Sequence, residues 1–187
     1  MNAGIVLVTG AMAAGKSTIA DLLARTLPRA AHVHGDIFRR WIVAGGASME
    51  PPLDAESETQ LNLRHALAAQ VARGYAEAGI TGVVQDLYPG PTLTRMCELL
   101  AGCPLRVVVL LPSADVLADR DAARAKTGYR GWSPTEFDRE FRDRTPRLGL
   151  WLDTSGQTPR QTVAEISDRW DEAVVSHTTR TEPAGSR

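Results

Sequence analysis

The chain has almost no net charge, few cysteines and no long apolar run. Its 21 basic and 22 acidic residues give a formal net charge of −1, so no overall field attracts nucleic acid or a membrane surface. Cys97 and Cys103 lack metal-ligand spacing and are expected to be small apolar residues in a reducing cytosol. No run approaches the ~20 apolar residues of a membrane span, and the N-terminus lacks a signal-peptide pattern. These absences predict a cytoplasmic protein without a membrane partner, and they argue against nucleic acid as a partner.

A glycine-bounded motif follows the first apolar run, at residues 5–8. Residues 10–17 read G-x-x-x-x-G-K-S. In this motif the backbone N–H groups curl around a phosphate, Lys16 reaches the β/γ-phosphates, and the Ser17 hydroxyl binds Mg²⁺. A simple glycine turn would explain the glycines but not the Lys-Ser pair, so the motif predicts a site for ATP and Mg²⁺. The predicted nucleotide-binding residues here are Gly10, Ala11, Met12, Ala13, Ala14, Gly15, Lys16, Ser17 and Thr18.

Strand-like apolar runs alternate with segments of helical period. This alternation predicts an α/β fold with a parallel sheet covered by helices on both faces. A helix is expected over 16–27, and a long amphipathic helix over 55–78. Capping boxes at 133–136 and 158–161 predict two further helices, the last over about 159–175. The expected strands cover residues 5–8, 31–34, 82–85, 105–111 and 148–152.

Polar residues follow the second and third runs. Because the crevice of such a sheet lies at the carboxyl ends of its strands, Asp36 is expected beside the phosphate. It could accept or orient the proton of an attacking hydroxyl, or simply cap a helix. Arg39 is a candidate acceptor-binding residue or part of a solvated helix face. Asp86 is a candidate for Mg²⁺ or the acceptor hydroxyl, or it caps a turn. Tyr88 is expected to line the acceptor pocket, and His34 is interpreted as structural.

Basic residues gather between residues 115 and 130. Arg120 and Arg124 are four residues apart and are expected on one helix face, with Arg130 following. Phosphoryl transfer needs cations over the migrating group, which a basic lid supplies when it closes. The alternative is a surface helix with acidic ion-pair partners. After the last run, Asp153 and Thr154 are expected near the base of the nucleotide.

The chain resembles the chloramphenicol phosphotransferase-like family of small P-loop kinases. The resemblance rests on the order of the glycine loop, Asp36, V-V-Q-D-L-Y-P-G at 83–90, Arg-Asp-x-x-Arg at 120–124 and Asp-Thr-Ser at 153–155. It implies a three-layer fold with five parallel strands in the order 2-3-1-4-5. The organisation along the chain predicts one domain over 1–176, with a substrate flap near 37–60, a lid near 124–140 and a tail over 177–187. The implied activity is ATP-dependent phosphorylation of a hydroxyl on a small molecule, such as an antibiotic or a nucleoside-type natural product. Asp36 would be the base, and Lys16, Arg120 and Arg124 would be the other catalytic residues.

The segment around Asp36 leaves the acceptor open. Gly35-Asp36-Ile37-Phe38-Arg39 also resembles the Asp-x-x-Arg of zeta toxins and polynucleotide 5′-kinases, and the Gly-Asp pair resembles gluconate kinases. The acceptor contacts are assigned to Asp36, Arg39, Asp86, Tyr88 and Arg130, and residues 41–59 are expected to select the acceptor. A nucleotide-hydrolysing switch is the hypothesis of another class. The sequence leaves the oligomeric state open.

Overall fold

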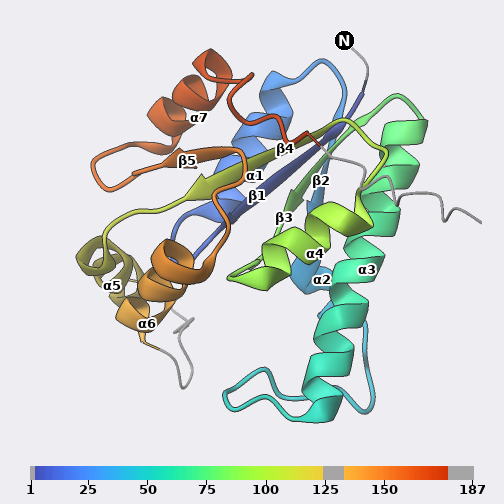
Figure 1. The fold of residues 1–187 in the computed structure, drawn as a ribbon, viewed down its shortest axis with the longest axis vertical. Coiled ribbons are helices and arrows are strands. Elements are labelled where there is room, and N and C mark those ends of the chain that lie inside the picture. Colours follow the sequence, from blue (N-terminus) through green and yellow to red (C-terminus); the bar gives the residue numbers. More distant parts are fainter. Residues whose placement is uncertain (1–2, 124–132, 177–187) are drawn as a thin grey trace, which may run out of the picture.

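Five parallel strands form the centre of the molecule. The structure is a computed structural model that describes residues 3–123 and 133–176. The sheet has the order β2-β3-β1-β4-β5, with every pairing parallel (Figure 1). This confirms the α/β fold and the strand order expected from the resemblance. The strands are β1 (Ile5–Gly10), β2 (Ala30–His34), β3 (Thr81–Gln85), β4 (Leu105–Leu110) and β5 (Leu150–Leu152).

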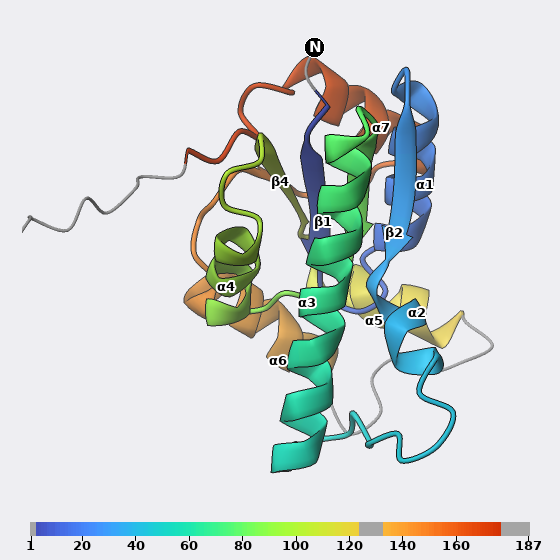
Figure 2. The same cartoon turned by 90° about the vertical axis from the view of Figure 1, so that its right-hand side faces the viewer.

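Helices cover both faces of the sheet, which is why its central strands β1 and β4 are largely apolar. On one face, α1 (Lys16–Thr26) packs beside α7 (Pro159–Asp168). On the other face, α3 (Ala55–Glu77) lies beside α4 (Pro91–Leu99) (Figure 2). All six residues of the central strand β1 are buried, as expected for a strand with neighbours on both sides and helices above and below.

Short helices gather at the carboxyl ends of the strands. They are α2 (Gly35–Arg40), α5 (Ala114–Ala122), α6 (Pro134–Arg139) and the π-helical turn η1 (Glu140–Arg144). Helix α3 has 23 residues, about 34 Å at 1.5 Å per residue, so its N-terminal half projects beyond the sheet (Figures 1 and 2). This projecting half forms one wall above the strand ends.

Local sequence signals set where several helices begin. Asp54 caps α3 by accepting a hydrogen bond from the Ser57 N–H at 2.8 Å. Both predicted capping boxes are present: Ser133 with Glu136 begins α6, and Thr158 with Gln161 begins α7. Each box satisfies N–H groups that have no partner inside the helix, so the start of the helix can be read from the sequence.

The prediction that the last helix continues to residue 175 is wrong, because α7 ends at Asp168. The following segment instead hydrogen-bonds to the beginning of β4, with Val107 N–H to Ala173 O at 2.8 Å and Val175 N–H to Leu105 O at 3.0 Å. That part of β4 lacks β5 as a neighbour, since β5 pairs only with residues 108–110. The segment after Asp168 therefore hydrogen-bonds to the free backbone groups of β4 and does not continue α7.

The basic segment is only partly described. Helix α5 contains Arg120 and ends at Ala122, two residues before Arg124. Arg124, Arg130 and residues 124–132 of the predicted lid lie outside the described residues, as does the predicted tail over 177–187. Across residues 3–123 and 133–176, none of the helices combines the length and the apolar character of a membrane span.

Candidate active site

The glycine motif forms the turn between β1 and α1. Gly10 and Gly15 have positive φ angles of 146° and 94°, and Ala13 also adopts a left-handed conformation. A Cβ atom on Gly10 would lie 2.3 Å from the Leu110 carbonyl oxygen, so the chain needs glycine there. Gly15 precedes α1 and provides no side-chain cap, so the N–H groups of the first helical turn remain suited to an anion.

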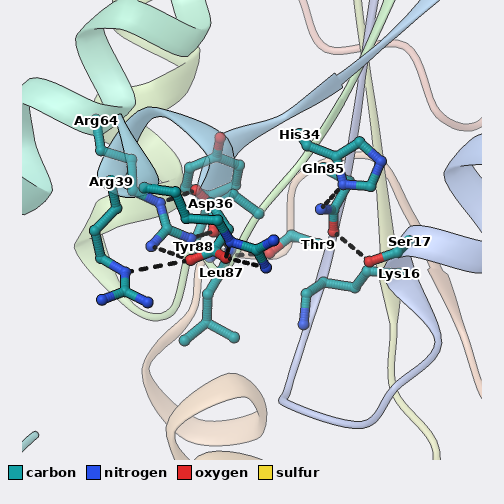
Figure 3. Close-up of polar contacts among 12 residues, drawn as sticks. Thr9, Lys16, Ser17, His34, Asp36, Arg39, Arg64, Gln85, Leu87 and Tyr88 are labelled. Atoms are coloured by element: carbon teal, nitrogen blue, oxygen red, sulfur yellow. Dashed lines mark hydrogen bonds and ion pairs between the residues drawn. The ribbon is translucent and has the colours of Figure 1, made fainter. Parts of the chain in front are cut away.

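Two side chains of this loop reach neighbouring groups. The Lys16 ammonium donates to the Ala11 carbonyl at 2.8 Å, across its own loop. The Ser17 hydroxyl donates to the amide oxygen of Gln85 at 3.3 Å (Figure 3). The lysine and the serine are thus both at the strand ends, as the motif predicts.

A cavity of about 330 Å³ lies beside the loop. Arg120 and Thr154 line it from the far side, and the Arg120 guanidinium donates to the Thr154 carbonyl at 2.9 Å. The structure therefore brings together six of the predicted nucleotide-binding residues, namely Ala13, Ala14, Gly15, Thr18, Arg120 and Thr154. Asp153 does not line this cavity, and its carboxylate accepts bonds from the Ser155 hydroxyl at 2.5 Å and the Ser155 N–H at 2.9 Å.

Asp36 lies at the start of α2, directly after β2, and its carboxylate is surrounded by arginines. Arg40 donates to it at 2.8 Å, and Arg39 and Arg64 lie 3.4 Å from one of its oxygens. Partial burial works to raise the pKa of Asp36, but Arg64, Arg40 and Arg39 outweigh it, so the pKa lies below its usual value. The side chain is still 34% exposed. Asp36 is therefore an ionised, accessible carboxylate at neutral pH.

Arg64 is a site residue that the sequence did not reveal. It comes from the projecting half of α3 and makes a two-pronged ion pair with Asp86, with Nε 2.6 Å from Oδ2 and Nη2 on Oδ1. The Arg64 side chain is 13% exposed and that of Asp86 only 3%. Burial works against the charge of Arg64, but Asp86 more than compensates and raises the pKa of the guanidinium. Nothing in the local pattern of α3 distinguishes Arg64 from a surface arginine.

Asp86 is held on every side. Besides Arg64, its Oδ1 accepts the Leu87 N–H at 2.7 Å. A Cβ atom on Gly35 would lie 1.9 Å from its Oδ2, so the glycine before Asp36 allows β2 and β3 to approach here. The ends of these two strands and α3 are thereby joined through Arg64, Asp86 and Asp36.

This arrangement differs from the expectation that Asp86 faces Mg²⁺ or the acceptor hydroxyl. A guanidinium occupies both of its oxygens and would repel a cation. The described residues also contain no cluster of three or more His, Cys, Asp or Glu side chains suited to a metal. The Ser17 hydroxyl does fit Mg²⁺, which takes one or two protein oxygens and completes its shell with phosphates and water.

Tyr88 differs from its predicted place. Its side chain is fully buried, its N–H donates to Thr9 Oγ1 at 3.0 Å, and its ring meets His65 edge-on at 5.0 Å between centroids. The ring therefore belongs to the core and not to an open acceptor pocket. A large ring after a buried strand gains more free energy from burial than from contact with water. His34, interpreted as structural, lies with its Nδ1 3.0 Å from the amide nitrogen of Gln85.

The sheet order and the glycine loop between β1 and α1 together define a P-loop α/β fold. Residues 5–145 match the model of the AAA_33 family, described as an AAA domain, and the chain belongs to that family. No curated protein matches the sequence.

Solved structures with the same fold include several small kinases. The APS kinase of Mycobacterium tuberculosis, in a complex with AMPPNP and APS, has a TM-score of 0.67 at 20% identity, covering 91% of this chain and 98% of that chain. A gluconokinase from Sinorhizobium meliloti 1021 has a TM-score of 0.62 at 18% identity, covering 92% and 94%. The tunicamycin resistance protein of Deinococcus radiodurans has a TM-score of 0.64 at 12% identity, covering 93% and 99%. These likenesses establish the fold.

Proposed function

We propose that this protein is an ATP-dependent kinase that phosphorylates a hydroxyl group of a small molecule. The observation that carries the proposal is the position of Asp36. This ionised carboxylate follows β2 at the edge of the sheet where the phosphate loop follows β1 (Figure 3). A carboxylate beside a phosphate loop suits transfer to a bound alcohol, because it can orient the attacking hydroxyl.

On the donor side, the loop and the adjacent cavity suit ATP. The N–H groups at the start of α1 would bind the phosphates, and the cavity between the loop and Thr154 would take the base and ribose. Lys16 would exchange the Ala11 carbonyl for a phosphate oxygen. Mg²⁺, held through Ser17, would neutralise charge on the phosphates.

On the acceptor side, Asp36 would act more as an orienting group than as a strong base. Its lowered pKa makes it a weak proton acceptor, and a loose phosphoryl-transfer transition state needs little proton removal. Arg64, fixed by Asp86, would hold the carboxylate in place. Arg39 is 42% exposed and can turn from Asp36 to a polar group of the acceptor.

For the acceptor we propose a hydroxylated natural product such as an antibiotic or nucleoside-type compound. This rests on the resemblance to the chloramphenicol phosphotransferase-like family. The shared fold with a tunicamycin resistance protein is consistent with it. A sugar-nucleotide or polynucleotide acceptor remains the alternative, with Arg39 as its phosphate contact.

Phosphate transfer from γ-labelled ATP tests the proposal. The purified protein is incubated with separate panels of antibiotics, nucleosides, sugars and 5′-hydroxyl oligonucleotides, and labelled products are separated and identified. Lys16→Ala should abolish transfer, and Asp36→Asn should reduce it by ~10²-fold or more while nucleotide still binds. Label that reaches only water with every panel would replace the kinase by a nucleotide-hydrolysing switch.

A further inference from the structure

Gln85 connects the phosphate loop with the neighbouring edge strand. It ends β3, lies in register between Val8 of β1 and His34 of β2, and is buried. The Ser17 hydroxyl donates to its Oε1 at 3.3 Å, and its Nε2 lies 3.0 Å from His34 Nδ1. Figure 3 shows the amide between the serine and the histidine. One carboxamide thus joins α1, β3 and β2.

The direction of this amide decides what the Ser17 oxygen can do. A hydroxyl has one proton to donate and two lone pairs to offer. While the proton goes to Gln85 Oε1, both lone pairs stay available to a cation. A reversed amide would point its NH₂ group at Ser17 and consume a lone pair. An unprotonated Nδ1 on His34 accepts from Nε2 and so favours the productive direction.

Charge makes this orientation important. The neighbouring carboxylate, Asp86, is neutralised by Arg64, and the two oxygens at Ser17 and Gln85 are uncharged. Cation binding at this point then depends on how well the neutral Ser17 hydroxyl is oriented. Groups that orient a metal ligand are typically worth 10–100-fold in metal affinity.

We propose that Gln85 is a positioning residue of the nucleotide site. It takes the proton of Ser17, so that the hydroxyl oxygen can bind the divalent cation of a nucleoside triphosphate, and His34 sets the direction of its amide. The inference rests on the proposed function, because it assumes that the protein binds a nucleotide together with Mg²⁺.

Isothermal titration calorimetry with AMPPNP, in Mg²⁺ and in EDTA, tests the role of Gln85. In Gln85→Leu the gain in affinity from Mg²⁺ should shrink by about 10–100-fold, with the affinity in EDTA unchanged. Gln85→Glu still accepts the Ser17 proton and should keep the gain. His34 is at an exposed position, and His34→Leu should lose part of the gain in affinity from Mg²⁺. This variant tests the proposal if Gln85→Leu does not fold. Gln70→Leu, an exposed glutamine of α3, is the matched control.

The possible outcomes separate the two proposals. An equal loss of affinity in Mg²⁺ and EDTA would make Gln85 merely structural and overturn the inference. An unchanged gain in Gln85→Leu, or in His34→Leu where only that variant folds, would overturn it too. If the unaltered protein gains nothing from Mg²⁺, the proposed kinase function itself fails.

Discussion

Removing the charge of Asp86 should destabilise the protein and disable the acceptor side together. Asp86→Asn keeps the shape of the side chain and an acceptor for the Leu87 N–H, but it leaves Arg64 with a neutral partner. Breaking a buried ion pair on one side typically costs 3–5 kcal/mol. Arg64 is 13% exposed and retains Asp36 3.4 Å away, so we expect the low end, about 3 kcal/mol.

Urea denaturation followed by circular dichroism measures this loss, which corresponds to a fall in Tm of roughly 6–12 °C for a chain of this size. The double variant Asp86→Leu with Arg64→Met removes both charges and should recover most of the stability, because no charge is then left unpaired. Phosphate transfer should fall in both variants, because Arg64 loses the partner that fixes it in Asp86→Asn and Asp36 loses Arg64 altogether in the double variant. A loss below about 1 kcal/mol in Asp86→Asn, the range of a surface pair, would refute the view that this pair is the buried anchor of the site.

Three further results are expected. Asp36→Asn should reduce phosphate transfer by ~10²-fold or more while AMPPNP affinity stays the same; near-normal turnover would remove Asp36 from its role. Stability should fall as the pH drops from about 6.5 to 4. Burial, partly offset by Asp86 and reinforced by Arg64, lowers the pKa of His65 to about 4, so the unfolded chain binds a proton that the folded chain does not. Protonation of His65 accounts for a loss of roughly 3 kcal/mol in the free energy of unfolding. A His65→Leu variant whose free energy of unfolding falls with pH just as steeply would contradict this assignment. Gly35→Ala should lower Tm because its Cβ would meet Asp86. Gly74→Ala, in open space on α3, should instead raise stability by roughly 0.5–1 kcal/mol. Similar shifts in the two variants would count against the close approach of Gly35 and Asp86.

The donor side could be predicted largely from the sequence. The glycine loop is a contiguous motif, and its backbone angles follow from the positions of its glycines. Thr154 could be placed opposite it because it follows a strand at the same edge of a parallel sheet, and Arg120 because it belongs to the basic helix that follows β4. The starts of α6 and α7 were legible because a capping box is a contact within four residues.

The acceptor side was predicted only in part. Asp36 was predicted because it follows a strand, but the arginines that surround its carboxylate were not predicted. Arg64 is 28 residues from Asp36 and 22 from Asp86, and only the packing of α3 across the strand ends brings them together. The prediction for Tyr88 was wrong: its position in the chain indicated the acceptor pocket, but its ring is buried in the core.

The sequence by itself determined the class of fold and the phosphate loop, since these depend on periodicity and on short motifs, and its resemblance to a known family implied the strand order. Tertiary structure alone decided how charge is arranged at the strand ends. It paired Asp86 with Arg64, surrounded Asp36 with guanidinium groups and placed Gln85 between Ser17 and His34. The reason is physical: ion pairs and hydrogen bonds of this kind form between elements distant in the chain, and their partners are chosen by proximity after the helices have packed.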